Sequence, residues 1–102
     1  MLTLWQTEWC RHSAAVRQRL TELGVDVVLR QVPADPDERH ELIQRFGDST
    51  VPLLETENGT AVVGSEAILE WLDARFVDRE DAELHHLRAR TALGKRCADL
   101  VA

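Results

Sequence analysis

The most constraining feature of this sequence is a strand, a helix and a second strand that follow one another within the first 32 residues, with almost no linker between them. Alternating leucines in residues 1–5 indicate a short strand, and the β-branched run in residues 25–32 indicates another. Between them, a helix begins near Arg11 and ends at Gly24, a residue type favoured just past a helix end. Its apolar stripe consists of Val16, Leu20 and Leu23. Two strands joined through one helix pair in parallel with a right-handed crossover, which predicts an α/β sheet.

The following residues predict a second helix and a hairpin. The helix opens at Pro36 or Asp37, since proline suits a first helical position, and it ends before Gly47. Its inward-facing side chains are expected to be Leu42, Ile43 and Phe46. Two apolar runs, 51–54 and 61–63, then enclose an Asn-Gly pair. This pair is the strongest short hairpin signal, so the two runs are predicted to be antiparallel strands.

A third helix starting at Gly64-Ser65 completes the predicted domain. Its apolar stripe consists of Ile68, Trp71, Leu72 and Phe76. The order β-α-β-α-β-β-α predicts a mixed four-stranded sheet with helices on both faces, which is the thioredoxin-like topology. No linker or repeat interrupts residues 1–77, so they are expected to form one domain. Residues 78–102 are expected to form a charged C-terminal helical extension that packs on this domain through Leu84, Leu87, Thr91, Gly94 and Ala98.

The charge balance restricts the classes of partner. Twelve basic against eighteen acidic residues give the 102-residue chain a net charge of −6, which disfavours nucleic acid and anionic membranes as partners. The sequence has no apolar run long enough to span a bilayer and no signal-peptide pattern, so a cytoplasmic location is expected. Two widely spaced cysteines, Cys10 and Cys97, do not make a disulfide framework, which favours a chemical role for at least one of them.

Cys10 lies at the predicted turn from the first strand into the first helix. Backbone N–H groups and the helix dipole at such a place favour the thiolate, and Arg11 and His12 would add positive field. An inert buried cysteine is the alternative. Ser13 stands where a two-cysteine oxidoreductase carries its second thiol, so an internal disulfide is not available; its hydroxyl either caps the helix or binds the sulfur. Trp9 shields the sulfur, stacks on a substrate or simply packs at the strand end.

The tripeptide Thr50-Val51-Pro52 leads into the third predicted strand. A cis Val51–Pro52 bond would leave the backbone of Val51 free to pair with an extended ligand. The alternative is an ordinary trans proline at the first residue of a strand. We predict the cis form because the tripeptide follows a β-α-β-α unit that carries a helix-terminal cysteine.

Over residues 1–77 the chain resembles glutaredoxins and the N-terminal domain of glutathione S-transferases. The segments that carry the resemblance are Cys10-Arg11-His12-Ser13, Thr50-Val51-Pro52 and Gly64-Ser65-Glu66-Ala67-Ile68. The resemblance implies that the Val51 backbone pairs with the cysteinyl part of glutathione. It also implies that Ser65 and Glu66 hold the γ-glutamyl carboxylate and amine, although a plain helix cap with an acidic first turn gives the same pattern. No basic residue for the glycyl carboxylate is evident in the sequence, since Asp48-Ser49 precedes Thr50, and Arg39 or Arg45 on the second helix is the candidate that could reach it.

The resemblance implies a monothiol thiol–disulfide oxidoreductase with Cys10 and Ser13 as catalytic residues. Trp9, Arg11, His12, Val51, Pro52, Ser65 and Glu66 form the expected substrate-binding set. The co-substrate is glutathione or another low-molecular-weight thiol, the partners are thiolated proteins, and no covalently bound cofactor or metal is expected. A non-catalytic transferase-like binding module and an arsenate-reductase type of reductase are the alternatives. Iron–sulfur delivery is disfavoured because the Gly-Phe pair of cluster-binding members is absent. Cys97 is expected to be a core residue, and the oligomeric state stays open.

Overall fold

The computed structural model describes residues 1–78, 80, 82–84 and 87. Its helices and strands, in chain order, are β1 (Leu2–Gln6), α1 (Arg11–Leu23), β2 (Val27–Gln31), the 3₁₀ helix η1 (Pro36–Glu38), α2 (His40–Phe46), β3 (Leu53–Glu55), β4 (Ala61–Val63) and α3 (Ser65–Arg75). The sheet order is β2-β1-β3-β4, with β1 and β2 parallel and the other neighbours antiparallel. The predicted mixed sheet and thioredoxin-like topology are therefore confirmed.

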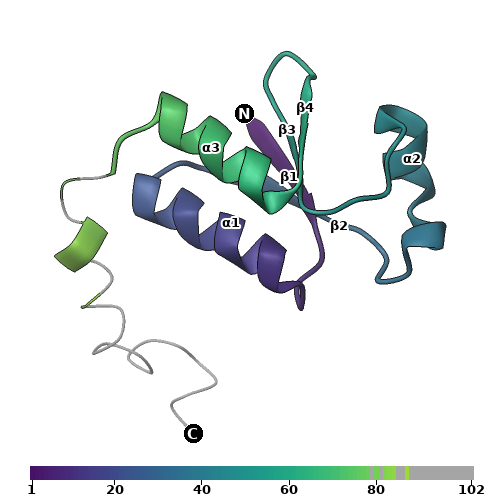
Figure 1. Ribbon diagram of the computed structural model, residues 1–102, viewed down its shortest axis with the longest axis horizontal. Helices are drawn as coiled ribbons and strands as arrows, with labels where there is room; N and C mark the ends of the chain where they lie inside the picture. Colours follow the sequence, from purple (N-terminus) through teal and green to yellow (C-terminus); the bar gives the residue numbers. More distant parts are fainter. Residues whose placement is uncertain (79, 81, 85–86, 88–102) are drawn as a thin grey trace, which may run out of the picture.

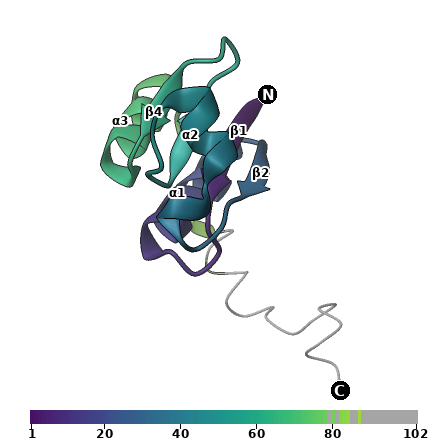
Figure 2. The same cartoon turned by 90° about the vertical axis from the view of Figure 1, so that its right-hand side faces the viewer.

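Helices cover both faces of the sheet. Figures 1 and 2 show α1 and α3 side by side on one face and α2 on the other. Leu4 and Leu54 pair across β1 and β3, and both face α1 and α3 in the larger core. Trp5 and Leu53, each one residue away along its strand, face the smaller core under α2. This division follows from the strand period of two, which sends successive side chains to opposite faces.

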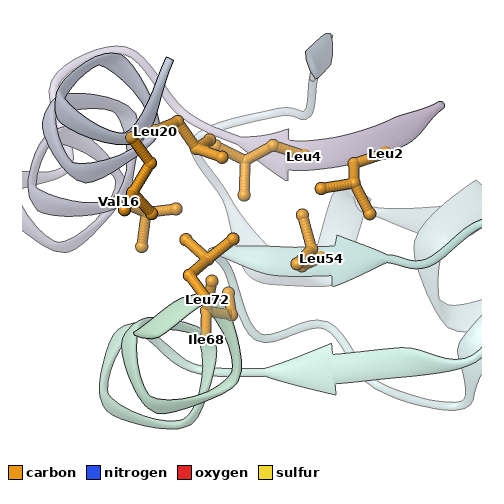
Figure 3. Packing of buried hydrophobic residues seen from close by; sticks show 8 residues of the cluster. Leu2, Leu4, Val16, Leu20, Leu54, Ile68 and Leu72 are labelled. Carbon is orange, nitrogen blue, oxygen red and sulfur yellow. The ribbon is translucent and has the colours of Figure 1, made fainter. Parts of the chain in front are cut away.

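The larger core joins both long helices to the central strands. Figure 3 shows leucine side chains of β1 and β3 pointing toward those of α1 and α3. Its buried members are Leu2, Leu4, Val16, Leu20, Leu23, Leu54, Ile68 and Leu72. Trp71 and Phe76 pack against this core and are only partly buried. The predicted stripes of the first and third helices are thus the faces that these helices bury.

The second strand and the second helix differ from their predicted bounds. β2 starts at Val27 because Gly24 and Val25 close α1, their N–H groups donating to the carbonyl of Leu20. The predicted second helix is split into η1 and α2 by Arg39, whose φ of −84° and ψ of 56° are not helical. Ile43 was expected to face inward but is 41% exposed, because Leu42 and Phe46 occupy the face of α2 that packs on the sheet and Ile43 points away from that face.

The C-terminal extension is described only in part. Residues 82–84 are helical, and Leu84 and Leu87 are exposed, so these two leucines do not pack on the domain as expected. Cys97 and the rest of the predicted stripe lie outside the described residues, and the boundary between residues 77 and 78 stays a prediction. Within the described part of the chain, no helix has the length and apolar character that crossing a bilayer requires.

Candidate functional site

Strand register brings three separate segments to one end of the sheet. Trp5 near the end of β1 pairs with Leu53 at the start of β3, and Leu53 pairs with Val63 at the end of β4. The N–H of Gly64 donates to the carbonyl of Pro52 over 2.9 Å. The loop before α1, the segment before β3 and the first turn of α3 therefore meet at this end, which Figure 1 shows beside the α1 N-terminus.

Cys10 is the N-cap residue of α1. Its backbone is extended, with φ −81° and ψ 120°, and its sulfur accepts the N–H of Ser13 over 3.5 Å. Its carbonyl accepts the N–H of Ala14, and its own N–H donates to Thr7 across the preceding turn. The first turn of a helix leaves N–H groups without partners inside the helix, and here the sulfur takes one of them. The half-buried thiol is thereby held at the positive end of α1.

The loop that presents Cys10 is anchored by residues that the sequence analysis did not single out. Gln6 ends β1 fully buried, and its side-chain oxygen accepts a hydrogen bond from Arg17 on α1. Arg17 also donates to the carbonyl of Glu8 over 3.4 Å and pairs with the Glu8 carboxylate. A buried amide needs such partners, so a glutamine that ends an apolar strand is the signal that would have revealed this anchor.

The pKa of the Cys10 thiol is lowered, in agreement with the prediction. Burial of the sulfur by itself raises this pKa, but hydrogen-bond donors around it outweigh the effect of burial. The backbone N–H of Ser13 lowers it first, followed by the Ser13 hydroxyl, the N–H of His12 and the hydroxyl of Thr7. The side chains of Arg11 and His12, expected to add positive field, make no such contribution. Fixed donors close to the sulfur therefore favour the thiolate.

Ser13 acts on the sulfur from inside the domain. Its side chain is fully buried, and among the described residues its hydroxyl has no hydrogen-bond partner of good geometry. The hydroxyl nevertheless lies close enough to Cys10 to contribute to the lowered pKa. The two expected catalytic residues thus lie together, and the helix cap is the cysteine itself, with Ser13 beneath it.

The lowered pKa predicts how thiol reactivity depends on pH. Because the hydrogen bonds lower the pKa of the Cys10 thiol from its ordinary value, the alkylation rate should fall only as the pH drops through that lowered value. The rate, followed against pH in a Cys97→Ser background, should have its midpoint below the free value. Ser13→Ala should move the midpoint upward because one donor is lost. A midpoint that does not move would show that the hydroxyl does not affect the sulfur.

Three residues beside Cys10 project into solvent. Trp9 is 95% exposed, so the alternative in which it simply packs at the strand end is wrong. Arg11 and His12 in the first turn of α1 are also exposed. An exposed indole beside a reactive sulfur is free to contact a substrate, because it fills no place in the core.

The predicted cis bond between Val51 and Pro52 is confirmed. Among the described residues, neither the N–H nor the carbonyl of Val51 takes part in a hydrogen bond. The segment before it is fixed by Asp48, whose carboxylate accepts the N–H of Thr50 over 2.8 Å. Hydrogen bonds from Thr50 hold the pKa of Asp48 below its ordinary value. Val51 thus presents free backbone groups from an ordered segment.

The first turn of α3 forms an open hollow at the same end of the sheet. Its lining residues are Val63, Gly64, Ser65, Glu66, Ala67 and Glu70. Gly64 is the N-cap, with a φ of 91° that favours glycine, and it has no side chain to satisfy the first N–H groups of α3. Ser65 is the first helical residue, not the cap, which removes the plain capping role for its side chain. Donors at this helix end therefore suit an anionic group.

The two arginines expected to hold a carboxylate are occupied within the protein. Arg39 is only 8% exposed, and its guanidinium donates to the carbonyls of Pro33, Ala34 and Ser49. Arg45 donates to the carboxylate of Glu55 over 2.9 Å and also lies over the ring of Trp5. Arg39 is therefore not free to bind the ligand carboxylate, because it is buried and each of its three nitrogens already has an acceptor. Arg45 uses only Nη2 and its side chain is 44% exposed, so its contact with the ligand stays a prediction.

Comparison with protein families gives a match that covers most of the chain. Residues 4–80 match the model of the glutathione S-transferase N-terminal domain. The matched range contains the cysteine loop, the Val51–Pro52 segment and the start of α3. No curated protein sequence matches the chain.

Several solved structures share the fold. A glutathione S-transferase domain-containing protein from Marinobacter aquaeolei is 30% identical, with a TM-score of 0.65, over 76% of this chain and 40% of its own. A glutathione transferase homologue from Sulfitobacter, solved with bound glutathione, is 25% identical, with a TM-score of 0.65, over 72% of this chain and 36% of its own. A glutathione S-transferase from Sinorhizobium meliloti is 27% identical, with a TM-score of 0.64, over 72% of this chain and 32% of its own. The chain thus spans at most 40% of the length of these proteins.

Proposed function

This chain belongs to the glutathione S-transferase N-terminal domain family, and from that premise we propose that it is a monothiol thiol–disulfide oxidoreductase whose reactive group is Cys10. Its substrates are mixed disulfides between a protein thiol and glutathione or another small thiol. The observation that carries this proposal is the sulfur at the N-cap of α1, with its lowered pKa. The thiolate is the attacking form in disulfide exchange, so this placement supports that chemistry.

The proposed reaction has two exchange steps. The Cys10 thiolate attacks the small-thiol sulfur of the mixed disulfide, a new disulfide forms on Cys10, and the protein substrate leaves as its thiolate. A second small thiol, as thiolate, then attacks the small-thiol sulfur of that adduct. The products are a disulfide of two small thiols and the regenerated Cys10 thiolate. Ser13 offers no second thiol, so the small thiol must resolve the adduct.

Recognition of the small thiol rests on two segments at the same end of the sheet. The backbone N–H and carbonyl of Val51 would pair with the cysteinyl part of glutathione. The first turn of α3 would bind the γ-glutamyl group, its carboxylate at the helix N-terminus near Ser65 and its amine beside the exposed Glu66. The Sulfitobacter relative was solved with bound glutathione, which supports this ligand class for the present chain.

Mass spectrometry of the purified protein tests the proposed chemistry directly. After incubation with oxidised glutathione, the protein should carry one glutathione adduct, located on Cys10. Other small disulfides, offered in parallel, would show which thiol is preferred. Reduced glutathione should then remove the adduct. Failure of every disulfide to modify Cys10 would contradict the proposal.

Glu66 should contribute to affinity for glutathione more than its neighbour Glu70 does. Both carboxylates line the hollow at the start of α3, but only Glu66 lies in the first helical turn. Glu66→Gln removes a charge-assisted hydrogen bond to the ligand amine and should raise KM for glutathione about tenfold. Glu70→Gln, the matched control, should change KM less than twofold. Equal changes in the two variants would contradict a specific contact at Glu66.

A non-catalytic binding module is the second candidate function. It is favoured by the internal hydrogen bonds of Arg39, which leave this buried guanidinium with no nitrogen free for a ligand carboxylate. The two candidates differ in turnover. A module that only binds would show affinity for glutathione or a partner protein with no measurable exchange, whereas the oxidoreductase would turn over a mixed disulfide.

A further inference from the structure

Arg39 is a charged residue in an unusual position between η1 and α2. Its side chain is buried, and its guanidinium donates to three backbone carbonyls: Nε to Pro33 over 2.8 Å, Nη2 to Ala34 over 2.9 Å and Nη1 to Ser49 over 2.7 Å. Among the described residues it forms no ion pair with a carboxylate. Burial of a cation without a counter-charge is unfavourable unless its donors are well used, as they are here.

The three hydrogen bonds join the two loops on either side of α2. Pro33 and Ala34 follow β2, whereas Ser49 lies two residues before Val51. The planar guanidinium holds both loops at once because its donors point in fixed directions. Around Ser49, the Asp48 carboxylate accepts the N–H of Thr50 and closes a local turn. The approach to Val51 is therefore held by one contact to Arg39 and by one turn within the segment itself.

We propose that Arg39 is a positioning residue for the small thiol, and this inference rests on the proposed function. Its guanidinium sets the path of residues 48–51, so that the free N–H and carbonyl of Val51 already have the direction needed to pair with the ligand. It acts through backbone geometry, without touching the ligand. Preorganised binding groups avoid the cost of ordering on association, so their loss lowers affinity.

The role of Arg39 predicts a separation between KM and kcat. Arg39→Ala should raise KM for glutathione about tenfold, since displaced binding groups lose much of their affinity. Cys10 lies on a different loop with its own anchor. The kcat should therefore stay within about twofold of wild type, and the pH midpoint of alkylation should not move. Arg39→Lys should behave like Arg39→Ala, since one ammonium group cannot reproduce the three-way fork.

Arg30→Ala is the matched control, because Arg30 on β2 pairs with the carboxylate of Glu41 on α2 and does not bond to either loop. It should leave KM unchanged. Guanidinium ion, at concentrations far below those that unfold proteins, should restore KM in Arg39→Ala and have no effect on wild type. If Arg39→Ala does not fold, Asp48→Ala loosens the same segment from its other contact and should show the same rise in KM.

A folded Arg39→Ala variant with wild-type KM would overturn the inference, and so would a fall in kcat with KM unchanged. Calorimetry with S-methylglutathione, which cannot exchange, separates this inference from the proposed function. Weaker binding by Arg39→Ala than by wild type, in a protein without exchange activity, would support Arg39 and contradict the oxidoreductase. Equal binding by both would overturn the role of Arg39 even if exchange is observed.

Discussion

Cys10→Ser is expected to lower the rate of exchange with a glutathione mixed disulfide by at least about 1000-fold. A serine hydroxyl does not ionise near neutral pH and cannot form a disulfide, so both steps of the reaction lose their nucleophile. The variant should fold as wild type does, because serine is a favourable N-cap residue at the start of α1. The rate is measured as reduction of a small mixed disulfide with glutathione in excess.

Cys97→Ser is the matched control for this experiment. Its sulfur belongs to the C-terminal extension, and the variant should keep most of the exchange activity. The double variant should be as inactive as Cys10→Ser. Equal loss from the two single replacements would point to a reaction between Cys10 and Cys97, which would contradict the one-thiol mechanism.

Leu54→Ala is expected to lower the free energy of unfolding by about 2–5 kcal/mol. Leu54 is fully buried in the middle of β3, where it pairs with Leu4 on one side and Val62 on the other. Figure 3 shows its side chain among those of the larger core. Removing its methyl groups leaves a cavity that rigid neighbours on both sides cannot fill. Unfolding by urea, followed by circular dichroism, measures the loss.

Val28→Ala provides the comparison within the same sheet. Val28 lies on the edge strand β2 and is 44% exposed, so its replacement should cost less than about 1 kcal/mol. Losses of similar size at Leu54 and Val28 would contradict the assignment of the stabilising contacts to the face covered by α1 and α3.

Local signals made most of the fold predictable. The Asn-Gly pair placed the hairpin, and β4 has the predicted bounds, 61–63. Gly24 and Gly47 end their helices in the left-handed conformation that glycine readily adopts. Each of these features depends on a few neighbouring residues, so the sequence is sufficient to indicate it. The parallel pairing of β1 with β2 follows from the helix between them.

The break before α2 was not predictable in this way. The helical pattern of residues 36–46 is continuous in the sequence, but the structure departs from it at Arg39. The cause is a set of hydrogen bonds to loops on both sides of the helix, one of them ten residues away at Ser49. A periodicity argument contains no information about such contacts.

In the candidate site too, some features were predictable from local sequence and others depend on tertiary contacts. The cysteine at a helix start and the cis Val51–Pro52 bond were predicted from local sequence, and the structure agrees with both. The anchor of Gln6 by Arg17 was missed because it joins the end of a strand to the middle of a helix. The internal use of Arg39 was missed for the same reason. The candidate site residues Cys10 and Val51–Pro52 could be predicted from local sequence, whereas the residues that hold their segments in place depend on tertiary contacts.

The two faces of the sheet have cores of unequal size, and this difference determines which part of the molecule unfolds first. Within the described part of the chain, eight buried hydrophobic residues join α1 and α3 to the sheet, whereas the buried members of the core under α2 are Trp5, Leu42 and Leu53. Less apolar area is exposed when α2 and its loops detach, so this unit opens at a lower free energy than the rest. Val51 follows the weaker unit, while Cys10 is anchored to the stronger one. Under mild destabilisation the protein would lose selectivity for its thiol partner before it lost the reactive sulfur.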